Sequence, residues 1–179
     1  MRSIAFIGRA GSGKDSAASR LYPAGYRRVA LADPVREVAL HIDPWVETDQ
    51  GLTRLSTLVD QLGWDRAKRG VPEVRRLLQN VGTAVRSVEP DFWLRQALRQ
   101  VAALEQENVP VVVTDCRFRN EATALREAGF LLARIVRPGL EPANHVSETD
   151  LDSFPTDATL CNDSTIEHLF AQVDALLDG

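Results

Sequence analysis

A glycine-rich segment near the amino terminus is the part of the sequence with the clearest chemistry. It consists of Gly8-Arg9-Ala10-Gly11-Ser12-Gly13-Lys14-Asp15 and follows directly on the apolar run Ile4–Ile7. The spacing of its glycines and lysine is that of a phosphate-binding P-loop, placed where a buried strand turns into a helix. Such a loop converges backbone N–H groups on phosphate oxygens, and its lysine reaches the β- and γ-phosphates. The segment therefore predicts that this chain binds a nucleoside triphosphate.

The P-loop departs from the usual pattern at one position. Asp15 stands where a Mg²⁺-binding Ser or Thr is expected, and a hydroxyl follows one residue later at Ser16. A second carboxylate, Asp115, closes the apolar run 109–114, where an acidic side chain usually holds Mg²⁺ or its water. We therefore expect Asp15 and Asp115 to bind the metal, with helix capping as the alternative role for Asp115. The residues expected to bind the triphosphate are Arg9, Gly11, Ser12, Gly13, Lys14, Asp15 and Ser16.

The elements that must position these residues alternate between strand and helix patterns. We expect strands over 3–7, 28–31, 109–114, 131–136 and 158–161. Helical patterns cover 14–21, a segment from Asp33 with Pro34 at its first position, and 52–62, 71–88, 91–106, 121–128 and 166–177, and Gly82 is expected to interrupt the pattern over 71–88. This alternation predicts one domain over 1–179, a three-layer α/β/α fold with a mostly parallel five-stranded sheet. The helical stretch 50–106 is interpreted as an insertion that covers the phosphate acceptor, and 137–155 as a lid-like loop.

Composition limits the partners of the chain. Its 179 residues carry a net charge of −4, so there is no general attraction to nucleic acid or to an anionic membrane surface. The first apolar run is too short for a signal peptide or membrane span. Cys116 and Cys161 form no metal-binding spacing, and we expect both to be small buried residues of a cytoplasmic protein. The expected partners are small molecules, and a homodimer is a possible assembly.

Four later blocks, with the Gly-Lys-Asp loop, resemble the bacteriophage-type deoxynucleoside monophosphate kinases of the P-loop nucleoside monophosphate kinase group. The blocks cover 32–36, 75–83 (followed by Arg86 and 91–93), 114–122, and 145–148 with Asn162-Asp163 further on, in the order found in that family. The family's third block usually contains Asp-Val-Arg-Phe-Pro-Asn-Glu, and here Cys116 and Arg119 replace the Val and the Pro. The resemblance implies transfer of the γ-phosphate of ATP to a deoxynucleoside 5′-monophosphate, with Mg²⁺. If the chain is phage-encoded, it would act in the host cytoplasm.

Phosphoryl transfer requires two polyanions held in line with their charge neutralised. Arginine must supply most of the cations, because Lys14 and Lys68 are the only lysines. We expect Lys14, Arg117 and Asp115 to act in catalysis. The residues expected to bind the acceptor are Asp33, Arg36, Arg75, Gln79, Arg86, Trp93 and Arg117, and Arg137 is expected to bind ATP.

These assignments have structural alternatives. A solvated or ion-paired arginine is the alternative for Arg75, Arg86 and Arg117, and a capping residue is the alternative for Asp33. Gln79 suits recognition of a base edge but also an exposed helical position. Trp93 could stack on a base, although a tryptophan in a helical hairpin usually belongs to the core.

Two other functions share this loop. One is a P-loop kinase with another acceptor, as in the phosphomevalonate or dephospho-coenzyme A kinases. The other is a nucleotide switch or motor ATPase, although 159–163 does not provide the Asn-Lys-x-Asp base reader of a GTPase. The sequence leaves open which bases are accepted and whether ribonucleotides are excluded.

Overall fold

A computed structural model of the chain describes residues 1–140 and 150–177. Its internal contacts divide the chain into two compact units, and each is described here by itself. Unit 1 comprises Met1–Leu31 and Leu98–Gly179, and unit 2 comprises Ala32–Ala97. Unit 2 thus begins earlier in the chain than the insertion predicted at about 50–106.

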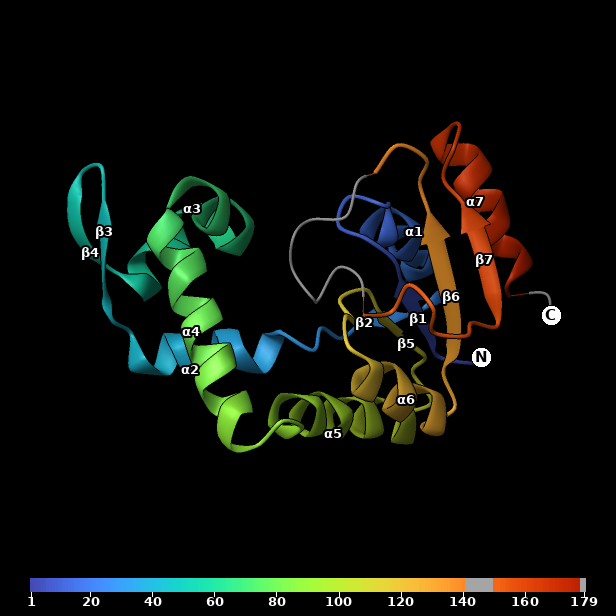
Figure 1. The fold of residues 1–179 in the computed structure, drawn as a ribbon, viewed down its shortest axis with the longest axis horizontal. Coiled ribbons are helices and arrows are strands. Elements are labelled where there is room, and N and C mark those ends of the chain that lie inside the picture. The colour runs from blue at the N-terminus through green and yellow to red at the C-terminus, as the bar shows by residue number, and fades with distance from the viewer. Residues whose placement is uncertain (141–149, 178–179) are drawn as a thin grey trace. The chain divides into compact units, whose positions relative to one another are not determined.

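Unit 1 is built on a parallel sheet with the strand order β2-β5-β1-β6-β7 (Figure 1). Within the described residues, its strands are β1 (Ile4–Ile7), β2 (Arg27–Arg28), β5 (Val111–Val113), β6 (Leu131–Val136) and β7 (Ala158–Cys161). Central β1 pairs Ile4 with Val112 of β5 and with Leu131 of β6. All four β1 residues are buried, because a parallel strand inside such a sheet has both faces covered. The predicted parallel five-stranded sheet is confirmed.

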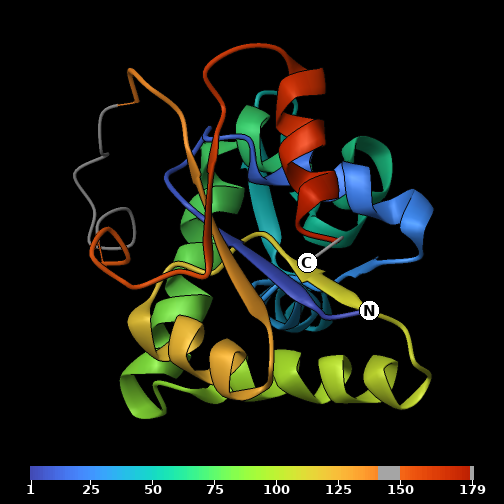
Figure 2. The same ribbon diagram turned by 90° about the vertical axis from the view of Figure 1, so that its right-hand side faces the viewer.

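Helices cover both faces of this sheet. On one face α1 (Lys14–Leu21) and α7 (Ile166–Ala175) pack together, with η1 (Tyr22–Ala24) after α1 (Figure 2). α6 (Arg119–Glu127) and the Leu98–Gln106 part of α5 (Phe92–Gln106) lie on the other face. The core beneath α1 and α7 contains Phe6, Leu21, Ile135, Leu169 and Val173, each no more than 1 % exposed. The three-layer α/β/α architecture is confirmed.

Unit 2 has its own apolar core and a small antiparallel sheet. Its elements are α2 (Asp33–Ile42), β3 (Trp45–Thr48), β4 (Gly51–Arg54), α3 (Leu55–Gly70), α4 (Pro72–Val88) and the start of α5. The core joins Ala39 of α2, Val46 of β3, Leu55 and Leu58 of α3, and Val74 of α4. Burial of these side chains from three helices and a strand makes the unit compact.

The β3–β4 hairpin corrects the predicted helix over 52–62. Leu52 pairs with Glu47 across the hairpin, and the helix begins only at Leu55. Gly51 has a φ of 107°, and the Thr48 side chain binds both the Gln50 N–H and the Gly51 carbonyl, which closes the turn. α3 then continues to Gly70, with a break at Gly63, where φ is 71°. The helix was therefore placed too early and made too short.

Three smaller expectations also change. Asp33 does not cap α2 in front of Pro34: the N-cap is Ala32, and Asp33 is already helical. Cys161 is exposed, whereas Cys116 is buried as expected. Gly82 does not interrupt α4, which is continuous from Pro72 to Val88.

Among the helices of the described residues, none combines the length and the apolarity needed to cross a membrane.

Candidate active site

The P-loop leaves β1 through a glycine that no other residue could replace without strain. Gly8 has a φ of 144°, and a Cβ placed on it would lie 2.4 Å from the carbonyl oxygen of Ile135 in β6. The loop then uses left-handed conformations at Gly11 and Gly13, with φ values of 77° and 105°, and α1 begins at Lys14. The predicted strand, glycine loop and helix N-terminus are thus all present. Consecutive backbone N–H groups in such a loop form an anion-binding concavity.

The side chain of Lys14 folds back onto the first residues of this loop. Its Nζ donates hydrogen bonds to the carbonyl oxygens of Gly8 and Arg9, each at 2.7 Å. The ammonium is therefore held against the loop that is expected to bind the phosphates. Ser12 is 1 % exposed, and among the described residues its hydroxyl has no hydrogen-bond partner. Ser16 is exposed in the first turn of α1.

Two arginines predicted to bind ATP are tied to this loop or its surroundings. Arg9 donates to the carbonyl of Leu140 and forms an ion pair with Asp152, both at 2.9 Å. Arg137 is exposed and donates to the carbonyl of Gly11 at 3.3 Å. Residues 141–149 of the predicted lid-like loop lie outside the described residues. For both arginines, ATP binding stays a prediction.

The two predicted metal ligands lie beside the end of β5. The hydroxyl of buried Thr114 donates to Oδ1 of Asp15 at 2.7 Å, and Asp115 follows Thr114 directly. Oδ1 of Asp115 accepts the backbone N–H of Leu31 at 2.9 Å. Within 1–140 and 150–177, no cluster of three or more His, Cys, Asp or Glu side chains is placed to hold a metal ion. Two carboxylates nevertheless suit Mg²⁺ that arrives with phosphate oxygens and water as its other ligands.

A buried glutamate shapes the loop between β5 and α6. Oε2 of Glu121 accepts the backbone N–H groups of Arg117 and Phe118 at 2.8 and 3.0 Å. This holds the start of α6 and leaves the Arg117 side chain exposed. Burial, together with the carboxylates of Glu121 and Asp115, raises the pKa of Cys116 well above its ordinary value. The thiol therefore stays neutral near pH 7 and is not a nucleophile.

In unit 2, Arg36 is partly sequestered by its neighbours. Its Nη1 forms an ion pair with Oδ1 of Asp33 at 2.8 Å, and its guanidinium lies over the Trp64 ring at 5.9 Å. Trp93 is 5 % exposed, and its indole N–H donates to the Gly82 carbonyl at 3.0 Å. This placement favours the core interpretation of Trp93 over base stacking.

The remaining acceptor candidates share one stripe of α4. With 3.6 residues per turn, Arg75, Gln79 and Arg86 lie within about 40° of one another around the helix axis. Arg75 and Gln79 are exposed and Arg86 is half-buried. Arg76 lies about 100° away from Arg75 and instead forms an ion pair with Glu73 at 2.9 Å.

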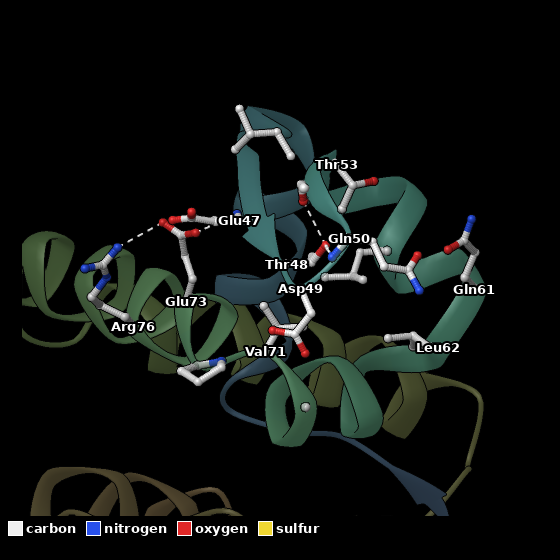
Figure 3. A pocket seen from close by; sticks show the side chains of 15 residues that line it. Glu47, Thr48, Asp49, Gln50, Thr53, Gln61, Leu62, Val71, Glu73 and Arg76 are labelled. Atoms are coloured by element: carbon white, nitrogen blue, oxygen red, sulfur yellow. Dashed lines mark hydrogen bonds and ion pairs between the residues drawn. The ribbon is translucent and has the colours of Figure 1, made fainter.

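The hairpin of unit 2 borders an open pocket of about 860 Å³ (Figure 3). Glu73 is on its wall, where it accepts the Glu47 N–H at 2.6 Å and pairs with Arg76. None of the described residues that line this pocket belongs to the set predicted to bind the acceptor. The pocket is therefore a feature separate from the predicted sites.

Three residues of the site were not assigned from the sequence. They are Thr114, which binds Asp15, Glu121, which orders the Arg117 loop, and Asn162, whose Nδ2 donates to the Ser12 carbonyl at 2.8 Å. A glutamate three residues after the helix N-cap Phe118 was a usable signal for Glu121. Thr114 and Asn162 lie in blocks that the family resemblance marked, but no local pattern shows their partners, which are 99 and 150 residues away.

Comparison with known proteins agrees with this geometry. Residues 69–173 match the family model for deoxynucleotide monophosphate kinase. An Acanthamoeba polyphaga mimivirus protein, to which deoxynucleotide monophosphate kinase activity is ascribed by name, is 27 % identical over 98 % of this chain and 96 % of its own. The deoxynucleotide monophosphate kinase of Enterobacteria phage T4 is 30 % identical over 104 residues, 56 % of this chain and 43 % of that protein.

The fold also matches a solved kinase. A sugar kinase from Janibacter superimposes with a TM-score of 0.52 at 18 % identity, over 99 % of this chain and 95 % of that one. The family match covers more than half of the chain, and the P-loop, its lysine and the parallel sheet are those of a P-loop kinase. The chain therefore belongs to the deoxynucleotide monophosphate kinase family.

Proposed function

We propose that this protein transfers the γ-phosphate of ATP to deoxynucleoside 5′-monophosphates, giving deoxynucleoside diphosphates and ADP. The observation that carries the proposal is the glycine-formed loop at the N-terminus of α1, with Lys14 held against it. Family membership supports a deoxynucleotide as the acceptor. An oxygen of the acceptor monophosphate attacks the γ-phosphorus, and the bond from that phosphorus to the β-phosphate oxygen breaks as ADP leaves.

On the donor side, the loop binds the triphosphate through its backbone N–H groups. Lys14 exchanges its two carbonyl partners for β- and γ-phosphate oxygens when ATP is bound. It then stabilises the negative charge of the transition state, in which the γ-phosphoryl group is between two oxygens. Arg9 and Arg137, both already bonded in this region, are proposed to add phosphate contacts.

Asp15 and Asp115 are proposed to hold Mg²⁺ directly or through water. The chemistry that the ion supplies when bound with ATP is neutralisation of charge on the β- and γ-phosphate oxygens. The hydroxyl of Thr114 fixes one oxygen of Asp15, and the N–H of Leu31 fixes one oxygen of Asp115. Each carboxylate is therefore held in orientation by a protein donor.

The acceptor is proposed to bind the α4 stripe of Arg75, Gln79 and Arg86. Guanidinium groups can hold a phosphate with two parallel hydrogen bonds, which fixes the position of the attacking oxygen. Gln79 carries both a donor and an acceptor and is proposed to contact the base edge. Arg117 is proposed to bind the migrating phosphoryl group. Asp33 and Arg36 remain proposed acceptor contacts, although their ion pair would have to open or be shared.

The experiment is a coupled assay of ADP formation with ATP, Mg²⁺ and each of the four deoxynucleoside monophosphates in turn. Turnover with at least one of them, absent in Lys14→Ala, supports the proposal. ADP release that is the same without any acceptor would indicate an ATPase. Turnover only with phosphomevalonate or dephospho-coenzyme A would indicate a P-loop kinase with another acceptor.

A matched pair of variants tests the α4 stripe. Arg75→Lys or Arg86→Lys keeps the positive charge but removes the paired N–H donors of the guanidinium. Each should therefore raise the acceptor KM with little change in kcat. Arg76→Lys, on another face of α4, is the control and should leave both parameters unchanged. Gln79→Ala should change the preference among bases, and Arg117→Ala should lower kcat. Wild-type kinetics in all four site variants would show that the acceptor site has been misplaced.

A further inference from the structure

The side chain of Asn162, at the end of β7, contacts the P-loop. Asn162 follows β7 directly, and its backbone N–H extends the β6–β7 ladder to the Val136 carbonyl at 2.8 Å. Its side-chain Nδ2 donates to the Ser12 carbonyl, also at 2.8 Å. The same Nδ2 would lie 2.5 Å from a Cβ on Gly13, so the amide fills the space that this glycine leaves.

The hydrogen bond fixes a peptide plane that the phosphate site depends on. The Ser12–Gly13 peptide is trans and planar, so the Ser12 carbonyl and the Gly13 N–H point in opposite directions. Holding the carbonyl toward β7 therefore aims the Gly13 N–H away from β7, into the loop. This plane turns about ψ of Ser12 and φ of Gly13, and glycine at position 13, with a positive φ, offers little resistance to that rotation. The Asn162 amide supplies the restraint that the glycines lack.

A second side chain fixes the position of Asn162 itself. Gln172 of α7 accepts the Cys161 N–H through Oε1 and donates to the Cys161 carbonyl through Nε2, each at 2.8 Å. Both backbone groups of the residue before Asn162 are thus held by one amide. The chain of contacts runs from α7 through the end of β7 to the loop at the start of α1.

We propose that Asn162, braced by Gln172, is a positioning residue that holds the Gly13 N–H in its phosphate-binding orientation. It touches no reacting atom and acts through the Ser12–Gly13 peptide. The inference rests on the proposed function only in that the P-loop binds the triphosphate of ATP. It does not depend on the identity of the acceptor.

The test measures binding of inorganic tripolyphosphate by calorimetry, which isolates the phosphate contacts from base and acceptor. Asn162→Ala should weaken binding roughly 10-fold, the size of one net hydrogen bond. Gln172→Ala should weaken it by a smaller factor, about 3-fold, because it acts one step further away. His168→Ala, exposed one turn earlier on α7, is the matched control and should bind as the wild type does.

A pH profile separates positioning from a merely structural role. In Asn162→Asp the ionised carboxylate cannot donate to the Ser12 carbonyl, whereas the protonated carboxyl can. The ratio of the variant's dissociation constant to that of the wild type should therefore shrink as pH falls from 7 to 4, toward the ordinary pKa of an aspartate at about 4. The same ratio for Asn162→Ala should stay constant. A purely structural loss would lower the free energy of unfolding in both variants without this pH dependence.

Two results would overturn the inference, and they are distinguishable. Wild-type affinity for tripolyphosphate in Asn162→Ala, or a pH-independent ratio in Asn162→Asp, would refute the positioning role alone. A wild-type protein that binds no tripolyphosphate would refute the proposed function and the inference with it.

Discussion

The substitution Gly8→Ala tests how tightly the P-loop is seated against the sheet. An alanine at a φ of 144° is strained by about 1–3 kcal/mol. Its Cβ would also lie 2.4 Å from the Ile135 carbonyl oxygen and 2.9 Å from Oγ of Ser12. Ile135 belongs to β6, which is paired on both sides by β1 and β7 and cannot easily move. Relieving that contact should cost about 1–3 kcal/mol more.

The expected total is about 4 kcal/mol of unfolding free energy, a large part of the 5–15 kcal/mol that is typical of whole domains. Urea denaturation followed by circular dichroism measures it. Gly129→Ala is the control: its φ is 86°, but a Cβ there meets nothing within 4 Å, so about 1–2 kcal/mol of strain is expected. If the two variants lose the same amount of unfolding free energy, the close packing of Gly8 against Ile135 of β6 is refuted.

The remaining predictions concern the site and the hairpin. Lys14→Ala should lower kcat by about 10²–10³-fold while the protein stays folded, and near-wild-type turnover would contradict its role. Thr114→Val, which keeps the shape and removes the donor to Asp15, should raise the Mg²⁺ concentration for half-maximal activity about 10-fold. An unchanged titration would show that the hydroxyl does not orient the carboxylate. The Glu47 N–H, with Arg76, lowers the pKa of Glu73, so the contact persists above the ordinary pKa and is lost as pH falls through the lowered one. Protection of the Glu47 amide against hydrogen exchange should therefore fall between pH 6 and pH 3, and Glu73→Gln should remove that pH dependence.

The sheet and the donor loop were predictable because their signals are local. Continuous apolar runs indicate buried parallel strands, and the bounds predicted for β6 and β7 match the structure. The P-loop combines glycine spacing, a preceding strand and a following helix within residues 4–21. Its sequence therefore specifies the path of its backbone, and distant contacts with Ile135 of β6 and with Asn162 complete its conformation.

The hairpin and the long-range contacts were not predictable in the same way. Leu52 and Leu55 fit a helical spacing of three residues, but the turn bonds of Thr48 and the positive φ of Gly51 favour a strand over 51–54. Thr114 and Asn162 gain their roles only when β5 and β7 lie beside the P-loop, which no local pattern encodes. Asp33 and Arg36 were read as ligands, whereas an ion pair three residues apart already satisfies part of their charge.

Because the sequence contains only two lysines, chemical modification of Lys14 can be followed without interference from many other amines. Apart from the chain's amino terminus, amine-acylating reagents have only two targets in this sequence, Lys14 and Lys68. Lys68 belongs to α3 of unit 2, so it serves as an internal reference while Lys14 reports on the phosphate loop. Because Lys14 donates to the Gly8 and Arg9 carbonyls, its acylation requires those bonds to open. The ratio of the two modified peptides in a mass spectrum, with and without ATP, therefore reads occupancy of the loop directly, without any engineered label.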